Sequence, residues 1–371
     1  MKPSLIVCGE SSADRYLSLI VKSIWKTEQL SFIALGGAYL DSIGVELIGN
    51  FRSISVIGVL EIVPKLSAII ALYNKLKKII RSGKVGAVIL ADFPDFNLRI
   101  AKIAKKAGIP VFYYISPQIW AWRKSRKYKI GRLVDELVVV LPFEKALYKN
   151  ITDNQFRVDY FGHPLIDIIK TKNNPDKSKP VLGIFPGSRD NEIERHLTLF
   201  MNSAGIIKKR IGNLKIMIAK APEIDIKRYG IYKDLLYKPE EIFKNATAAL
   251  LKSGTITLET AIAGIPGVIC YKLSNVSYIA GKLLIKGIGS MGLPNIIMGR
   301  NIYPEFIQHL DPQTIANSLM TYFNNSKRET SINDIKKIRN MLGEEGVIDR
   351  TAARLYEFIK SSSNDFMKSE V

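Results

Sequence analysis

Cysteine and histidine are scarce in this chain of 371 residues. Its two cysteines, Cys8 and Cys270, belong to no Cys-x-x-Cys pair, so the sequence indicates neither a disulfide framework nor a zinc site. That usage favours a reducing compartment. The three histidines form no metal-type cluster and the chain has no Walker phosphate loop. We therefore expect no metal site and no cofactor.

A long uninterrupted hydrophobic run is also missing. The apolar stretch at the N-terminus is too short for a signal peptide and is typical of a first strand. The most apolar stretch elsewhere, residues 53–72, is interrupted by Gly58, Glu61, Pro64 and Lys65, which disfavours a membrane-spanning helix. We expect a cytoplasmic protein that at most touches a membrane.

Acidic residues are outnumbered, with 54 Lys and Arg against 34 Asp and Glu and a net charge of +20. Such a surplus concentrates anions near the protein surface, which suits a phosphorylated substrate, an anionic membrane or nucleic acid. The cations are spread along the chain and no recognised nucleic-acid module is present, but a basic nucleic-acid-binding protein stays an alternative.

Short apolar runs alternate with amphipathic helical patterns, which predicts βαβ units and parallel sheets. We expect strands at residues 5–8, 32–35, 85–90, 111–115, 136–140, 181–185, 215–219, 248–251 and 267–271. Helices are expected from about residue 192 and over 257–263. The polar segment 173–180 contains two prolines and is typical of a linker. Because the chain is long for one core, we expect two doubly wound α/β domains that face each other across a cleft.

Two turns in the second half follow expected strands and are typical of phosphate sites. The first contains Ser188 and Arg189, which would present backbone amides and a guanidinium fork to a diphosphate. The second, residues 253–255, offers Ser253, Gly254 and Thr255, and Glu259 lies one turn further on, where its carboxylate could accept from ribose hydroxyls. Ordinary βα turns and helix capping explain the same residues without a ligand.

Carboxylates and tryptophans stand out in the first half. Glu10 and Asp95 follow expected strands, where a base that deprotonates a hydroxyl would lie, although helix caps favour the same residue types. A tryptophan pair, Trp120 and Trp122, precedes a run of cations. That combination suits an acyl chain carrying a phosphate, and a solvated basic helix is the alternative. The cations nearest the pair are Arg123, Arg126 and Lys127.

The order and spacing of these motifs resemble the lipid-A-disaccharide synthase family over nearly the whole chain. The matching segments are residues 9–14, 94–97, 116–123, 141–144, 161–164, 186–189, 253–255, 293–295 and 299–300. The resemblance implies a GT-B fold of two Rossmann-like domains. It also implies a peripheral enzyme on the cytoplasmic face of a Gram-negative inner membrane, which joins UDP-2,3-diacylglucosamine to 2,3-diacylglucosamine 1-phosphate with inversion, makes a β1→6 disaccharide and releases UDP.

The resemblance also implies roles for single residues. Asp95 matches the general base, with Glu10 the next candidate, and Arg189 matches an essential arginine. Ser253, Thr255 and Glu259 match a UDP-binding turn, and Asn295 matches a site asparagine. The acyl chains would meet the hydrophobic residues Val56, Ile57 and Leu60.

With this resemblance, we expect the chain to divide into four parts. Residues 1–167 would bind the acceptor, 168–180 would be the linker, 181–345 would bind the UDP-sugar, and 346–371 would form a helical tail on the first domain. Two departures from the family stand out. The family has Gly at the position of Ala13, so a backbone conformation with positive φ there is in doubt. It has Ser at the position of Gly292, so a possible hydrogen bond of that serine is missing here. A UDP-sugar 2-epimerase would share this fold and is the alternative enzyme. Acyl-chain length and oligomeric state stay open.

Overall fold

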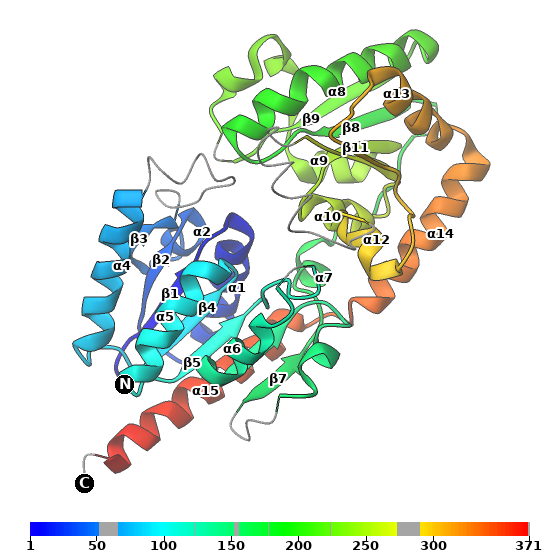
Figure 1. The fold of residues 1–371 in the computed structure, drawn as a ribbon. Helices are drawn as coiled ribbons and strands as arrows, with labels where there is room; N and C mark the ends of the chain where they lie inside the picture. The colour runs from blue at the N-terminus through cyan, green and yellow to red at the C-terminus, as the bar shows by residue number, and fades with distance from the viewer. Residues whose placement is uncertain are drawn as a thin grey trace. The chain divides into compact units, whose positions relative to one another are not determined.

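The computed structural model describes residues 1–51, 66–121, 123–151, 156–176, 178–222, 224–272 and 290–369. They form two units, each a parallel sheet covered by helices (Figure 1). Unit 1 comprises Met1–Asp167 and Gly343–Val371, and unit 2 comprises Ile168–Leu342. The chain therefore leaves unit 1 once and returns to it.

In unit 1 the described strands form a seven-stranded sheet of order β3-β2-β1-β4-β5-β6-β7 in which all pairs are parallel. The strands are β1 Ser4–Cys8, β2 Phe32–Gly36, β3 Glu46–Asn50, β4 Ala87–Ala91, β5 Val111–Tyr114, β6 Glu136–Val139 and β7 Arg157–Tyr160. The helices are α1 Ser11–Trp25, α2 Ala38–Asp41, α4 Leu66–Arg81, α5 Pro94–Lys106, α6 Arg126–Leu133, the 3-10 helix Lys145–Tyr148, α7 Leu165–Ile168 and α15 Val347–Ser369.

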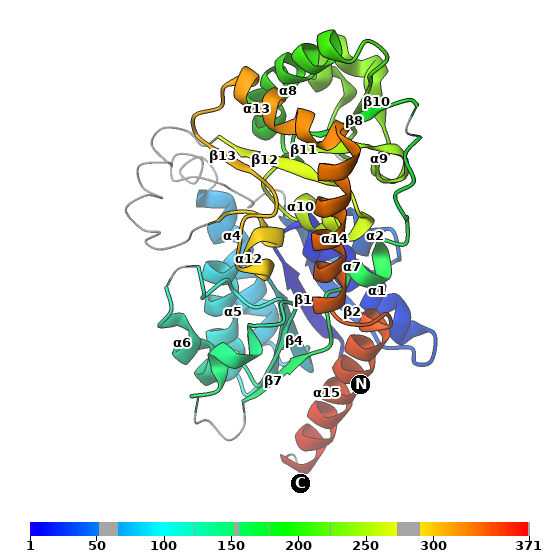
Figure 2. The same ribbon diagram turned by 90° about the vertical axis from the view of Figure 1, so that its right-hand side faces the viewer.

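Helices cover both faces of this sheet, which explains why its central strands are apolar throughout. Every residue of β1 and β4 is buried. On one face α4, α5 and α6 pack side by side, and α1 and α15 pack together on the other (Figures 1 and 2). The helices have apolar residues at the spacing of one helical face; in α1 these include Leu17, Ile20, Val21 and Ile24, all buried.

Unit 2 repeats the plan with a six-stranded parallel sheet in the described residues, of order β10-β9-β8-β11-β12-β13. The strands are β8 Val181–Phe185, β9 Lys215–Ala219, β10 Leu236–Tyr237, β11 Ala248–Lys252, β12 Gly267–Tyr271 and β13 Glu305–Ile307. The helices are α8 Asp190–Arg210, α9 Pro239–Asn245, α10 Ile256–Ala263, α12 Leu293–Met298, α13 Pro312–Met320 and α14 Asn325–Met341, with 3-10 helices at Ile226–Leu235 and Thr321–Phe323.

The two Rossmann-like units confirm the predicted fold class, and every predicted strand is present within two residues of its expected bounds. Four strands were not predicted, namely β3, β7, β10 and β13. All four lie at sheet edges, where their residues are only partly buried. An edge strand needs no continuous apolar run, so the pattern that predicts central strands misses it.

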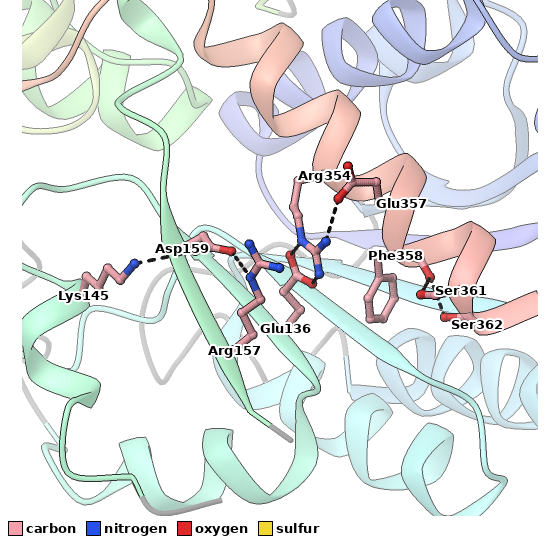
Figure 3. Close-up of polar contacts among 9 residues, drawn as sticks. All are labelled: Glu136, Lys145, Arg157, Asp159, Arg354, Glu357, Phe358, Ser361 and Ser362. Carbon is pink, nitrogen blue, oxygen red and sulfur yellow. Dashed lines mark hydrogen bonds and ion pairs between the residues drawn. The ribbon is translucent and has the colours of Figure 1, made fainter. Parts of the chain in front are cut away.

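Helix α15, the last in the chain, is bound to the sheet of unit 1 (Figure 3). Its Arg354 donates two hydrogen bonds to the Glu136 carboxylate of β6, Nε to Oε1 and Nη2 to Oε2, each at 2.6 Å. Glu136 is buried, which raises its pKa, although Arg354 opposes that shift. Phe358 packs on Phe112 with ring centroids 5.4 Å apart.

The start of α15 is held by the Asp167 carboxylate, which accepts from the backbone amides of Gly346 and Ile348 at 2.7 Å each. A carboxylate there satisfies amides that a helix start leaves unpaired. The segment from Gly343 onward thus folds with the first 167 residues, because these contacts join segments about 180 positions apart in sequence.

Breaking the Arg354–Glu136 pair should destabilise unit 1. The Arg354→Met substitution leaves a buried carboxylate without its cation, which typically costs about 3 kcal/mol or more. We expect a lower unfolding midpoint and faster amide exchange in α15 and β6. Glu357, the exposed partner of the same guanidinium at 2.7 Å, provides the control, since Glu357→Gln should cost less than about 1 kcal/mol. Equal losses in the two variants would contradict the assignment.

Candidate functional site

The first predicted phosphate turn of unit 2 joins β8 to α8. Arg189 caps α8 in an extended backbone conformation. Its Nη1 donates to Oε1 of Glu192 at 3.1 Å, and the backbone amide of Ser188 donates to Oε2 of the same carboxylate at 2.9 Å. Ser188 is exposed and Arg189 is partly exposed, so both can meet a ligand.

The second predicted turn joins β11 to α10, and β11 pairs directly with β8. Lys252, the last residue of β11, contacts Oε1 of Glu192 through its ammonium group at 2.7 Å. The Ser253 amide donates to the Cys270 carbonyl at 3.1 Å, while Gly254 is exposed and Thr255 is the N-cap of α10. Glu259 lies in the first turn of α10 and is partly exposed.

One buried carboxylate therefore connects the two turns. Glu192 binds the Ser188 amide and the Arg189 guanidinium from the first turn and the Lys252 ammonium from the second. Burial by itself would raise the pKa of Glu192, but Lys252 and then Arg189 and Ser188 bring it below its ordinary value. Two cations against one carboxylate leave this cluster with a net positive charge, which favours an anionic ligand.

Sequence patterns alone predicted only that a helix begins near Glu192, and assigned no role to Lys252. Their link could be inferred only from the pairing of β8 with β11. His196 lies one helical turn after Glu192 in α8 and bonds to the residue that follows β12. Its Nδ1 lies 2.8 Å from the Glu192 carbonyl and its Nε2 accepts from the Lys272 amide, so the ring is neutral, and burial lowers its pKa.

Asn295 of α12 is buried, and its amide group is fully engaged inside the protein. Its Nδ2 donates to the Tyr303 carbonyl and the Glu305 carboxylate, and its Oδ1 accepts from the amides of Ile302 and Tyr303. Glu305 also accepts from the Met291 and Gly292 amides. Asn295 and Glu305 together hold the segment before α12 against β13.

A Cβ built on Gly292 would lie 2.3 Å from Cδ1 of Ile269, so the end of that side chain would have to move to accept the serine of the family. The departure at Ala13 requires no special backbone conformation. Ala13 lies buried in α1 and is not among the residues with positive φ, so glycine is not needed there and alanine favours the helix.

In unit 1, Asp95 lies in the first turn of α5, directly after β4. The turn is unusual because Asp92 and Phe93 both have left-handed backbone conformations, with φ of 49° and 48°. The buried Asn97 stabilises it by donating to the Asp92 carbonyl at 2.7 Å. Phe93 packs so closely on Gly9 that a Cβ there would lie 2.4 Å from Cβ of Phe93. Strain of this kind is common at functional sites.

The structure brings Asp95 together with two predicted acceptor-site cations. Arg123 Nη1 and Arg126 Nη2 lie 3.0 Å and 2.5 Å from Oδ1 of Asp95. Arg126 is almost fully buried, whereas Asp95 is 62% exposed and so keeps a free approach from solvent. Sequence reasoning predicted all three residues but not their contact. Glu10, the other carboxylate, is partly exposed at the N-cap of α1.

Trp120 lies in the segment between β5 and α6, and its indole ring packs inward. Its ring meets Phe143 edge-on at 5.7 Å and its Nε1 donates to Oε1 of Glu144 at 3.2 Å. The Glu144 carboxylate also accepts from the amides of Val140 and Leu141. Burial raises the pKa of Glu144 to about 7, although these N–H groups favour its charged form.

The remaining predicted contacts cannot all be placed. Lys127 lies in α6 with its ammonium 5.2 Å from the Tyr128 ring. Trp122, Val56, Ile57 and Leu60 lie outside the described residues. Within the described residues, no helix has the length and apolar character needed to cross a membrane.

Comparisons with known proteins agree over most of the chain. A sequence profile of the family described as lipid-A-disaccharide synthetase matches residues 4–355. A lipid-A-disaccharide synthase of Persephonella marina is 35% identical over 380 residues, covering 96% of this chain and 99% of that protein. One of Syntrophus aciditrophicus is 36% identical over 382 residues, covering 96% and 98%.

Solved structures share the fold at low identity. A UDP co-structure of Staphylococcus aureus MnaA has a TM-score of 0.62 at 12% identity and covers 97% of each chain. A Neisseria meningitidis UDP-GlcNAc 2-epimerase bound to UDP-GlcNAc scores 0.61 at 12%, covering 97% of this chain and 100% of its own. MurG of Acinetobacter baumannii scores 0.55 at 12%, covering 96% and 100%. At such identities these likenesses show the fold alone.

Glu144 should make stability depend on pH near neutrality. Its pKa in the folded chain lies above its ordinary 4.5, so the protonated group stabilises the fold at low pH, and this is lost as the pH rises through about 7. Between pH 4.5 and about 7, the wild type should lose free energy of unfolding as the pH rises. The Glu144→Gln variant should lose less, by at most about 1.4 kcal/mol per pH unit. The exposed Glu240→Gln is the control. If the free energy of unfolding changed as steeply with pH in the variant as in the wild type, Glu144 would not be the group that causes the dependence.

Proposed function

The chain belongs to the lipid-A-disaccharide synthetase family, and from this premise we propose that it joins UDP-2,3-diacylglucosamine to 2,3-diacylglucosamine 1-phosphate and releases UDP. As a member of the family it is a glycosyltransferase that forms the lipid A disaccharide. The particular substrates, the β1→6 linkage and the inversion are parts of the proposal. So are the roles of single residues.

The observation that best supports a nucleotide-sugar donor is the cluster around Glu192. Two turns that follow adjacent parallel strands are joined by one carboxylate, and the cluster keeps a net positive charge. We propose that the UDP diphosphate binds here, with Arg189 as its permanent cation and with Ser188, Ser253, Gly254 and Thr255 lining it. The N-terminal end of α10 adds a partial positive charge.

Charge development explains the use of Arg189. As the bond between the sugar and UDP breaks, negative charge grows on the diphosphate, and a fixed guanidinium stabilises that charge without reorganising. Lys252 is nearly buried and holds Glu192, so we assign it to positioning the two turns. We propose that Glu259 accepts hydrogen bonds from the ribose hydroxyls, which do not change during the reaction. Asn295 would act by holding the segment before α12.

Asp95 is the proposed general base for the acceptor 6-hydroxyl. Its carboxylate is exposed on one side and held by Arg123 and Arg126 on the other, so its direction is fixed while one oxygen stays approachable. The two guanidinium groups also suit the 1-phosphate of the acceptor. Glu10, on the neighbouring strand β1, is the second candidate for the base.

The acylated sugars require contact with a lipid phase, and we propose that the enzyme is peripheral on the cytoplasmic face of the inner membrane. Trp120 and Lys127 would lie near the lipid, together with Trp122, Val56, Ile57 and Leu60. Oligomeric association is compatible with this scheme.

The epimerase alternative has support only from the fold. Its structural likeness comes at 12% identity, whereas the synthase relatives match nearly full length at about three times that identity. A nucleic-acid role has no comparable support.

The reaction itself provides the first test. Wild-type protein with UDP-diacylglucosamine and the monosaccharide phosphate should form a disaccharide and one UDP per product, and UDP without added acceptor would instead favour an epimerase. The Asp95→Asn variant should lose turnover by about a hundredfold or more, because it lacks the base, and should keep its affinity for UDP.

Asp349→Asn is the matched control for Asp95, since Asp349 is an equally exposed first-turn aspartate paired with a lysine. It should behave as wild type. Near-wild-type turnover of Asp95→Asn would move the role of base to Glu10.

The donor site makes a second prediction. Arg189→Ala and Glu259→Ala should both weaken UDP binding, but only the arginine change should also slow a single turnover strongly, since diphosphate charge grows in the transition state and ribose contacts do not. Arg228→Ala is the control, because Arg228 pairs with Asp190 at the start of the same helix α8 and is exposed. Equal single-turnover losses for Arg189 and Glu259 would refute this division of roles.

A further inference from the structure

The turn between β4 and α5 has a backbone conformation that its own residues disfavour. Asp92 and Phe93 are both left-handed, with φ of 49° and 48°, and neither is glycine. This conformation costs free energy for any residue with a side chain, so two in succession persist only where the surrounding structure holds them. The turn leads directly into Pro94 and Asp95, the first residues of α5. The groups that hold it therefore set the position of the Asp95 carboxylate.

One backbone carbonyl of this turn accepts hydrogen bonds from two buried side chains. Asn97 Nδ2 donates to the Asp92 carbonyl at 2.7 Å, and the Tyr113 hydroxyl donates to the same oxygen at 2.6 Å. Asn97 belongs to α5 and Tyr113 to β5, the strand that pairs with β4, and both are fully buried. Because the two donors approach from different elements, the peptide group between Asp92 and Phe93 is fixed in its orientation.

The Asn97 amide also binds the ends of two strands. Its Nδ2 lies 3.1 Å from the Ala91 carbonyl of β4 and 3.3 Å from the Val7 carbonyl of β1. Its Oδ1 is buried and has no hydrogen-bond partner in the part of the chain that the structure describes. Most buried amides use both their donor and their acceptor. Asn97 serves here as a donor to three carbonyls, which suits it to hold backbone in place.

Phe93 packs this turn against the turn that follows β1. Its ring stacks on Phe96 with centroids 5.2 Å apart, and a Cβ built on Gly9 would lie 2.4 Å from the Phe93 Cβ. Glycine at residue 9 permits this close approach because it has no side chain. Gly9 directly precedes Glu10, the second candidate for the base. The turns that bear the two candidate bases are therefore packed on each other.

We propose that Tyr113 and Asn97 are positioning residues for the transfer reaction, which hold the left-handed turn after β4 and through it the Asp95 carboxylate. The inference rests on the proposed function, in which Asp95 is the general base. Tyr113 and Asn97 are fully buried, so they act through the turn and not by touching the sugars. Holding the base matters because a displacement of about 1 Å can cost roughly a hundredfold in rate.

The Tyr113→Phe variant removes one hydroxyl and leaves the buried ring in place. It should lower kcat for disaccharide formation by about tenfold and leave KM for the acceptor and the affinity for UDP unchanged, because the turn loses one donor and the binding groups lose nothing. Asn97→Leu should act in the same direction and more strongly, since it removes the donor to three carbonyls. A rise in KM with unchanged kcat would contradict a role in positioning the base.

Tyr322→Phe is the matched control for Tyr113→Phe. Tyr322 is also a buried tyrosine, and its hydroxyl bonds to Ser331 in unit 2. The control should lose a similar amount of thermal stability and keep the kcat of the wild type. If kcat fell in both variants in proportion to the loss of melting temperature, Tyr113 would contribute to stability alone and the proposal would be overturned.

A double variant tests whether Tyr113 acts through Asp95. In the Asp95→Asn background, Tyr113→Phe should change the single-turnover rate by less than about twofold, because the base that it positions is already absent. If the two losses multiplied, the two residues would act independently and the inference would be refuted.

Amide hydrogen exchange without substrates separates this inference from the proposed function. The Asn97 amide donates to the Phe93 carbonyl at 3.0 Å, and it should exchange up to about tenfold faster in Tyr113→Phe, while the amides of β8 and β11 should not change. Equal exchange of the Asn97 amide in variant and wild type would overturn the proposal whatever the reaction is. If the wild type forms no disaccharide but exchange behaves as expected, the proposed function fails, and Tyr113 and Asn97 still hold the turn.

Discussion

Parallel strand pairing is the constraint on which the arrangement of this protein depends. All strand pairs in both sheets run parallel, so the turn after every strand emerges at the same sheet edge. In unit 1, Glu10, Asp95, Trp120 and Glu144 follow four strands that are neighbours in the sheet, β1, β4, β5 and β6. Residues over more than 130 positions of sequence therefore gather at one edge.

Buried or partly buried carboxylates then hold the turns in place. Glu192 joins two turns of unit 2, Glu305 holds the segment before α12, and Glu144 holds Trp120. Each accepts backbone amides or cations, which offset the desolvation of the charge at Glu192 but only in part at Glu144, whose pKa stays raised. The groups proposed to bind a ligand, such as Arg189 and the exposed Gly254, lie beside these carboxylates. Rigid support beneath a site lets it bind charge without reorganising.

The surplus of positive charge divides into two populations. Cations near the carboxyl edges of the sheets, such as Arg126 and Lys252, are nearly buried and paired, so they hold the carboxylates of Asp95 and Glu192 in place. Others, such as Arg99 and Lys102 in the middle of α5, have no partner among the described residues and contribute to the field around the protein. The same net charge would suit a phosphorylated substrate as well as an anionic surface, which is why composition alone could not choose between them.

The sequence by itself determined the central strands, the two Rossmann-like units and the turns at which Arg189, Ser253 and Asp95 lie. Buried parallel strands require continuous apolar runs, and such runs can be recognised from neighbouring residues alone. The edge strands β3, β7, β10 and β13 could not be predicted from the sequence, since a partly buried strand needs no continuous apolar run. Only the tertiary structure decided the pairs: Asp95 with Arg123 and Arg126, Glu192 with Lys252, and Glu136 with Arg354. Each joins residues about 30 to 220 positions apart, and a contact between distant residues is set by strand order and helix packing, which no local pattern contains.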